Sequence, residues 1–61
     1  MLSDFPEILT TEEAADILRV GYNTLYDLLQ SGKLKAYRNG RIWRIPKRSV
    51  IEYIIERSKL N

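Results

Sequence analysis

The sequence predicts a mainly α-helical fold with one small β-hairpin, in the order helix, turn, helix, hairpin, helix. Two stretches carry apolar residues at i, i+3 and i+4, the spacing of one helix face, and only a few residues separate them. An Asn-Gly pair between two β-prone segments then predicts a hairpin. With 61 residues the chain is expected to form a single domain, residues 1–61, with its core over residues 8–57.

The first helix is expected over residues 11–18. Thr10 suits the N-cap position, and Glu13 completes a capping-box pattern, in which each residue satisfies a backbone N–H of the other. The acidic residues that open this stretch also suit the positive end of the helix dipole. We expect the helix to end near Arg19. Its inward stripe consists of Ala14, Ile17 and Leu18.

The second helix is expected over residues 22–30. Gly21 can serve as its N-cap, and Gly32 supplies the stop, because glycine readily adopts the left-handed conformation that follows a helix. Two short helices joined by so tight a turn cross steeply, which is helix-turn-helix geometry. Val20 is expected to fill the gap between them. The inward stripe of this helix consists of Leu25, Leu28 and Leu29.

The next segment predicts a hairpin over residues 35–45. Asn39-Gly40 is expected to form a type I′ turn, in which both central residues have a positive φ. Alternation along the second strand places Arg41, Trp43 and Ile45 on one face, and Ile42 and Arg44 on the other. Trp43 could be a stacking platform for single-stranded bases. We expect it in the core instead, because so small a domain needs its largest side chain inside.

A third helix is expected over residues 47–58, after Pro46 ends the second strand. Its apolar residues cover more than half of the circumference, a wide arc for one small core. Two explanations stay open at this point. The arc can pack against both the hairpin and the helix pair, or part of it can bind another protein. The arc consists of Val50, Ile51, Tyr53, Ile54 and Ile55.

The formal net charge of +2 hides a division along the chain. Residues 1–30 hold six acidic side chains and one basic one, whereas residues 31–48 hold seven basic side chains and no acidic one. Such asymmetry suggests a polyanionic partner that meets one face of the protein. The alternative is a basic hairpin that is simply solvated. The seven basic residues are Lys33, Lys35, Arg38, Arg41, Arg44, Lys47 and Arg48.

Composition argues against several function classes. The chain has no cysteine and no histidine, so it lacks thiolate and imidazole metal ligands and the commonest general base. Its serines therefore have no histidine to activate them. We expect no catalysis, no cofactor and no small-molecule substrate. The first residues resemble no secretory signal and no apolar run reaches membrane-spanning length, so a cytoplasmic protein with no membrane partner is expected.

The second helix carries side chains suited to DNA. Asn23, Asp27 and Gln30 lie opposite the leucine stripe, with Thr24 and Tyr26 on its flanks. The second helix of a helix-turn-helix enters the major groove. Asn and Gln can bind adenine there, while Thr and Tyr hydroxyls suit phosphates. The alternative is an ordinary polar helix face exposed to water.

Residues 9–54 resemble the excisionase-type, MerR-related winged helix-turn-helix DNA-binding domain. The resemblance is carried by "LTTEEAA" at the first helix, by Thr24 and Tyr26, by "SGKL" after the second helix, and by the pattern R.G..WRIP from Arg38 to Pro46. It implies binding of double-stranded DNA, with helix 22–30 in the major groove and hairpin 35–45 as the wing on the backbone or in the minor groove.

The residues and the resemblance together lead us to predict eleven DNA-contacting residues. They are Tyr22, Asn23, Thr24, Tyr26, Asp27, Lys35, Arg38, Asn39, Arg41, Arg44 and Lys47. The chain departs from the family at Gly21, where members commonly have Ser, and at Tyr22 and Asp27, where they commonly have Arg. A carboxylate at position 27 repels phosphate unless it accepts a hydrogen bond from a cytosine amino group.

The resemblance implies an excisionase-like recombination factor or a small transcription regulator. One such module buries roughly 600–1,000 Å² on DNA, too little for high specificity, so an integrase or a second copy on the DNA is an expected partner. The rival is a protein-interaction adaptor that works through helix 47–58. RNA binding has less support, because adjacent strands present no pair of aromatic residues for base stacking.

Overall fold

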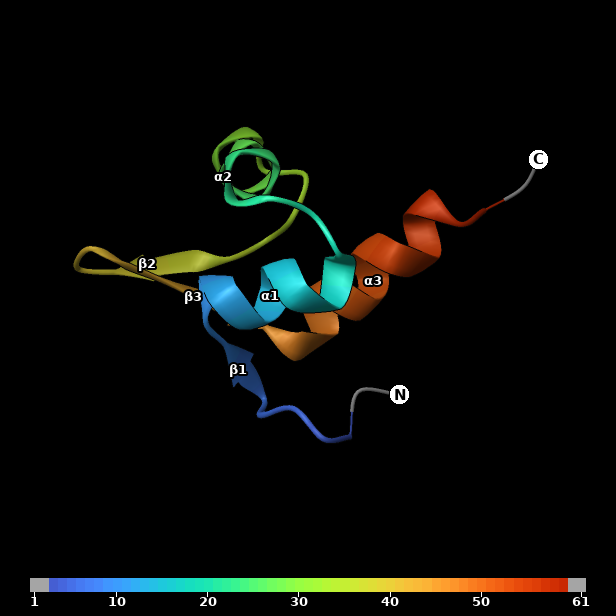
Figure 1. The fold of residues 1–61 in the computed structure, drawn as a ribbon, viewed down its shortest axis with the longest axis horizontal. Helices are drawn as coiled ribbons and strands as arrows, with labels where there is room; N and C mark the ends of the chain where they lie inside the picture. The colour runs from blue at the N-terminus through green and yellow to red at the C-terminus, as the bar shows by residue number, and fades with distance from the viewer. Residues whose placement is uncertain (1–2, 60–61) are drawn as a thin grey trace.

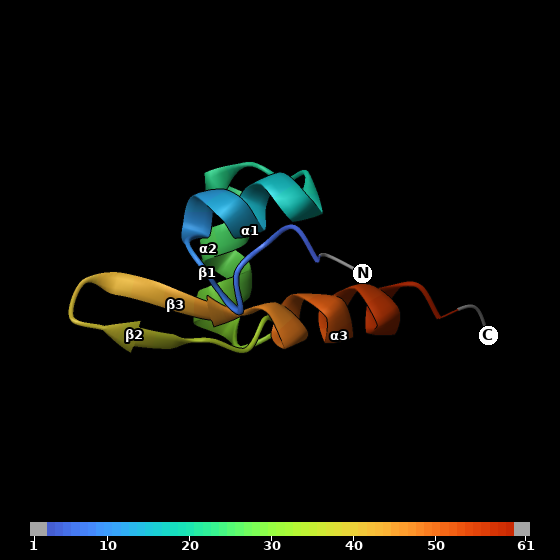
Figure 2. The same ribbon diagram turned by 90° about the horizontal axis from the view of Figure 1, so that it is seen from below.

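Three helices and three short strands make up residues 3–59, the part of the chain that the computed structural model describes (Figure 1). In chain order they are β1 (Ile8–Leu9), α1 (Thr11–Leu18), α2 (Tyr22–Ser31), β2 (Tyr37–Asn39), β3 (Ile42–Pro46) and α3 (Lys47–Arg57). The β2–β3 hairpin and α3 extend toward opposite ends of the molecule, with α1 and α2 beside the point where they meet (Figure 2). This arrangement confirms the predicted winged helix-turn-helix fold.

The ends of α1 and the steep crossing of α1 and α2 agree with the prediction from local sequence signals. The capping box is formed: the N–H of Glu13 donates to Thr10 Oγ1 at 3.1 Å, and the N–H of Thr10 donates to Glu13 Oε1 at 3.0 Å. Arg19 ends α1 in the left-handed conformation, with φ of 59°. In Figure 1, α1 runs across the view while α2 is seen end-on, so the two axes cross steeply. Val20, in the turn, packs against the core.

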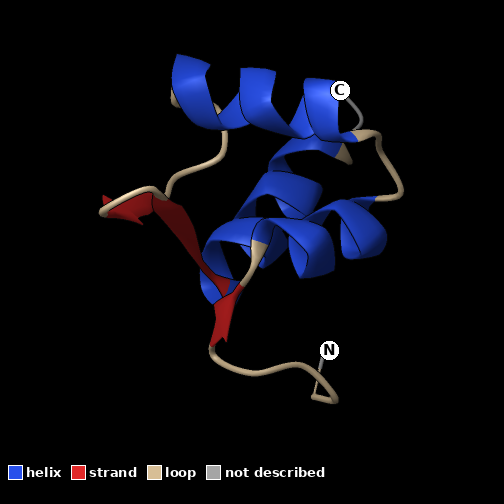
Figure 3. Cartoon of the chain, turned by 60° about the vertical axis from the view of Figure 1, so that its left-hand side comes forward, coloured by secondary structure: helices blue, strands red, loops and turns tan. Residues whose placement is uncertain are grey.

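The sheet contains a strand that the sequence analysis did not predict. Its order is β1-β3-β2 and both pairs are antiparallel (Figure 3). β1 pairs Ile8 with Pro46 and Leu9 with Ile45. Just beyond this pair, the N–H of Lys47 donates to the Glu7 carbonyl oxygen at 2.7 Å. The first amide of α3 has no partner within its own helix, so the segment before β1 satisfies it.

The hairpin turn lies one residue later than predicted. Asn39 pairs with Ile42, so the connecting residues are Gly40 and Arg41, and only Gly40 has a positive φ, of 71°. The predicted type I′ turn at Asn39-Gly40 is therefore wrong, and a positive φ at the first central position alone is typical of a type II′ turn. The predicted register would have placed Arg38 opposite Arg41, and like charges directly opposite each other are unfavourable.

The core draws on every element except β2. Its buried residues are Leu9, Ala14, Ala15, Leu25, Leu29, Leu34, Ile45 and Val50. Trp43 is only partly buried and packs against the edge of this cluster, which differs from the predicted place in the core. The hairpin extends beyond the helices (Figure 2). Ile45, next to the end of β3 that joins α3, is fully buried, whereas Trp43, two residues nearer the turn, is only partly covered.

α3 is buried on one side. Val50 is fully buried, and Tyr53 and Ile54 pack against the core. Ile55 is 54% exposed, so internal packing accounts for most of the wide apolar arc but not for all of it. Among residues 3–59, no helix has the length and apolar character needed to cross a membrane.

Candidate nucleic-acid interface

The polar face of α2 is open to solvent. Burial of Leu25 and Leu29 fixes the inward side of the helix, which turns the intervening residues outward. Tyr22 is 49% exposed and Tyr26 is 39% exposed, and their ring centroids lie 6.5 Å apart. All five contacts predicted on this helix are exposed: Tyr22, Asn23, Thr24, Tyr26 and Asp27.

The N-terminus of α2 suits a negatively charged group. Gly21, its N-cap, provides no side-chain hydrogen bond, and no acidic residue lies in the first turn. Backbone N–H groups in the first turn of a helix have no intrahelical partner and attract anions such as phosphate. α1 differs, because Thr10 caps it and two acidic residues follow in its first turn.

The hairpin distributes its basic residues over both faces and its tip. Cross-strand pairing places Arg38 opposite Trp43 and Tyr37 opposite Arg44, while Arg41 lies in the turn. The guanidinium carbon of Arg38 is 5.4 Å from the centroid of the Trp43 ring, which is cation–π geometry. Of the contacts predicted in this segment, Arg44 is half-buried and the exposed ones are Lys35, Arg38, Asn39 and Arg41.

α2 and the hairpin border one recess, which we call the α2–hairpin recess. α2 contributes Tyr26 and Gln30 to it, and the hairpin contributes Arg38, Arg41 and Trp43. Its volume is about 400 Å³. The structure thus brings the two predicted contact elements together. Four lining residues were not among the predicted contacts. Two are Ile42 and Trp43, both on β3. The others are Gln30, which the helical periodicity does place outward, and Thr11, at the start of α1, for which no sequence signal pointed to this surface.

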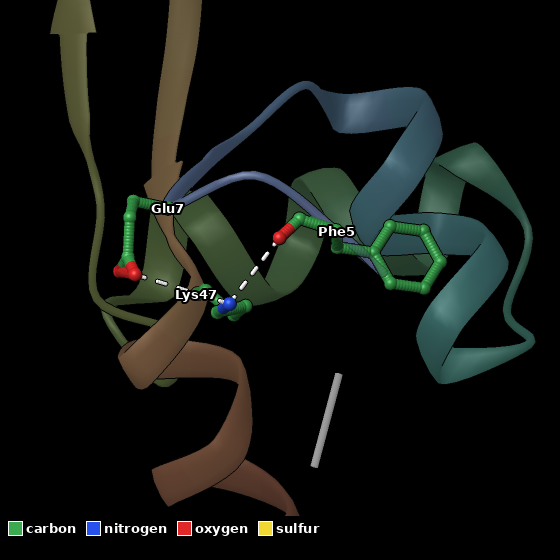
Figure 4. A network of polar contacts seen from close by, with 3 residues as sticks. All are labelled: Phe5, Glu7 and Lys47. Atoms are coloured by element: carbon green, nitrogen blue, oxygen red, sulfur yellow. Dashed lines mark hydrogen bonds and ion pairs between the residues drawn. The ribbon is translucent and has the colours of Figure 1, made fainter. Parts of the chain in front are cut away.

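Lys47 does not line this recess. Its Nζ donates a hydrogen bond to the carbonyl oxygen of Phe5 at 3.2 Å and lies 3.9 Å from Glu7 Oε2 (Figure 4). Only 16% of the Lys47 side chain is exposed. The ammonium group links the segment before β1 to the start of α3, so the structure does not bring Lys47 together with the other predicted contacts.

A helix-turn-helix whose second helix is exposed beside a basic hairpin defines a winged helix-turn-helix protein. The helix-turn-helix domain family matches residues 8–58, and the chain belongs to this family. It is 41% identical over 46 residues to a probable excisionase of Saccharopolyspora erythraea, an alignment that covers 75% of this chain and 47% of that protein. This relationship confirms the resemblance to an excisionase-type domain.

A second relative is the uncharacterized protein YvgK of Bacillus subtilis (strain 168). It is 43% identical over 44 residues, which cover 72% of this chain and 14% of that protein. The shared region therefore spans about half of the probable excisionase and a much smaller part of YvgK. No solved structure matches the chain significantly.

Proposed function

We propose that the chain binds double-stranded DNA without catalysing a reaction, with α2 in the major groove and the β2–β3 hairpin on the backbone or in the adjacent minor groove. The family supports DNA binding in general. The observation that best supports this particular arrangement is that the polar face of α2 and the arginines of the hairpin border the same recess. Phosphates would relieve the mutual repulsion of the basic side chains.

We propose that α2 reads base edges and that the β2–β3 hairpin binds the DNA backbone. Asn23 lies near the start of α2, where a groove-bound helix meets base edges, and its amide can pair with adenine. Lys35, Arg38, Arg41 and Arg44 are proposed to bind phosphates, because the hairpin has no acidic residue that would neutralise their charges. The tyrosine and threonine hydroxyls of α2 are proposed to hold the backbone beside the groove.

A recombination role is supported by the probable excisionase among the relatives. The alternative within the same class is a small transcription regulator. In either role one module covers little DNA, so a second copy or an integrase is the proposed partner. Selection of bound duplexes from a random library tests the proposal directly, and DNA binding without any enriched sequence would contradict base reading by α2.

A second candidate function is a protein-interaction adaptor that works through α3. The exposed side chain of Ile55 favours it, because this residue lies on the apolar side of α3 and outside the core. Ile55→Lys separates the two functions. The substitution should leave DNA affinity unchanged if the interface lies on α2 and the hairpin, as proposed.

Asn23→Ala is expected to weaken binding to the selected duplex by about 1–3 kcal/mol and to change binding to a scrambled duplex little. The reason is that a lost base contact affects only the sequence that offers it. Competition between the two duplexes at one fixed salt concentration measures the difference. An equal loss on both duplexes would mean that Asn23 contacts the backbone.

Asp27→Ala is a companion measurement, because two mechanisms predict opposite changes in DNA affinity. If the Asp27 carboxylate accepts a hydrogen bond from a cytosine amino group, Asp27→Ala weakens binding to the selected duplex and reduces the preference for one base pair. If it only repels phosphate, the same change tightens binding to every duplex.

We propose that Lys47 lies outside the DNA interface, and Lys47→Met and Arg41→Met form a matched pair that tests this. Both remove one positive charge and keep a long apolar stem. We expect Arg41→Met to reduce the dependence of log affinity on log salt by roughly one unit, and Lys47→Met to leave it unchanged. Lys47→Met should instead lower the free energy of unfolding by about 1 kcal/mol, because the Phe5 carbonyl loses its donor. An equal change in salt dependence for both variants would restore Lys47 to the interface.

A further inference from the structure

We propose that the α2–hairpin recess binds one phosphate of the DNA strand that separates the major groove from the adjacent minor groove. This inference rests on the proposed function. A single backbone strand lies between two neighbouring grooves of a duplex. If α2 occupies the major groove and the hairpin reaches the minor groove beside it, that strand must pass between the two elements. The recess lies at this place.

The lining of the recess has the chemistry of a phosphate site. Tyr26 contributes a hydroxyl, Gln30 an amide, and Arg38 and Arg41 contribute guanidinium groups. Each of these groups can donate to a phosphate oxygen, and arginine can do so with two parallel hydrogen bonds. None of the lining residues is acidic. A ligand with negative charge and several acceptor oxygens therefore fits this set of donors.

Thr11, the first residue of α1, also lines the recess and adds a hydroxyl to its set of donors. The acidic residues of the first turn of α1, Glu12 and Glu13, line a different hollow, beside Phe5 and the turn between α1 and α2. Neither of these two residues lines the recess.

Trp43 acts here as a positioning residue. Its ring lines the recess and lies 5.4 Å from the guanidinium carbon of Arg38. A cation–π contact restricts a long, flexible side chain before the phosphate arrives, so less conformational entropy is lost on binding. This role also accounts for a tryptophan that the core leaves partly exposed.

The only tryptophan of the chain makes the recess directly observable. A phosphate bound there would shield Trp43 from acrylamide. We expect duplex DNA at saturation to lower the acrylamide quenching constant of the unmodified protein. Saturation is followed in parallel by the fluorescence anisotropy of a labelled duplex. No anisotropy change would reject the proposed function itself, whereas a saturated complex with unchanged quenching would overturn only the recess as the phosphate site.

A scan with single methylphosphonate linkages, which are neutral, then locates the phosphate. Wild-type protein should lose about tenfold in affinity at one linkage between the two grooves, the effect of losing one charge-assisted set of hydrogen bonds. Arg38→Ala and Gln30→Ala should show little further loss at that linkage, because the contact is already gone. If Arg38→Ala lost as much affinity as the wild-type protein at every methylphosphonate linkage, the proposal would be overturned.

Arg57→Ala is the matched control for this scan. It removes the same charge from the last turn of α3, which points away from the hairpin (Figure 2). This variant should keep the wild-type pattern of sensitivity. Circular dichroism confirms that each variant is folded before its affinity is compared.

Discussion

The affinity of this chain for duplex DNA is expected to fall by roughly two to three orders of magnitude as salt rises from about 50 to about 200 mM. Each phosphate that a basic side chain neutralises releases counterions, which contributes about −0.9 to the slope of log affinity against log salt. With five such contacts the slope is about −4.5. Four of these contacts are the ones proposed above, Lys35, Arg38, Arg41 and Arg44, and we propose Lys33, an exposed residue of the same basic segment, as the fifth.

A titration of affinity by fluorescence anisotropy across this salt range measures the slope. Arg57→Ala should leave it unchanged, because that side chain lies on α3, outside the proposed interface. Arg38→Ala should reduce its magnitude by about 0.9. A slope near zero in the wild-type protein would remove the electrostatic basis for DNA binding and would favour the adaptor function through α3.

The helices could be predicted from the sequence because their signals are local. The capping box joins Thr10 to Glu13, and the left-handed stop at Gly32 follows directly after α2. Apolar periodicity also fixed which side of α2 faces solvent, and with it most of the candidate site. All of these signals act within about one helical turn, so no knowledge of distant residues was needed.

The features that the sequence analysis missed depend on distant partners. β1 has only two residues and exists because it pairs with β3. Lys47 is a residue type that commonly binds phosphate, yet its ammonium group donates to the carbonyl oxygen of Phe5, 42 positions earlier. Thr11 reaches the recess only because α1 packs near the hairpin. None of these contacts has a periodic or local pattern that could indicate it.

The turn shows how a small error changes a candidate site. A shift of one residue moves Arg38 from opposite Arg41 to opposite Trp43. Trp43 and Ile45 nevertheless share the face that packs in or against the core, as predicted, because the faces depend on alternation within the strand and not on the pairing register. Arg41, predicted on the same face, lies in the turn instead. The cation–π contact that orients Arg38 depends on that register, and so could not be inferred from the predicted turn.

The largest effect on stability is expected for Ile45→Ala. Ile45 is fully buried and pairs with Leu9, so its truncation leaves a cavity at the centre of the fold. Such a substitution costs about 2–5 kcal/mol. A domain of this size has a free energy of unfolding of about 3–9 kcal/mol, so much of its stability would be lost.

Ile42→Ala is the matched control for that substitution. Ile42 lies on the same strand but on its other face, and it is 56% exposed, so the same chemical change should cost about 0.5 kcal/mol. Urea unfolding followed by circular dichroism compares the two variants. Because Ile45→Ala can remove the folded baseline, Ile45→Val, with an expected cost of about 0.5–1.5 kcal/mol, keeps the measurement quantitative. Equal costs for Ile45→Ala and Ile42→Ala would mean that the hairpin does not present one face to the core, and the position of Trp43 and Arg38 beside α2 would then lose its basis.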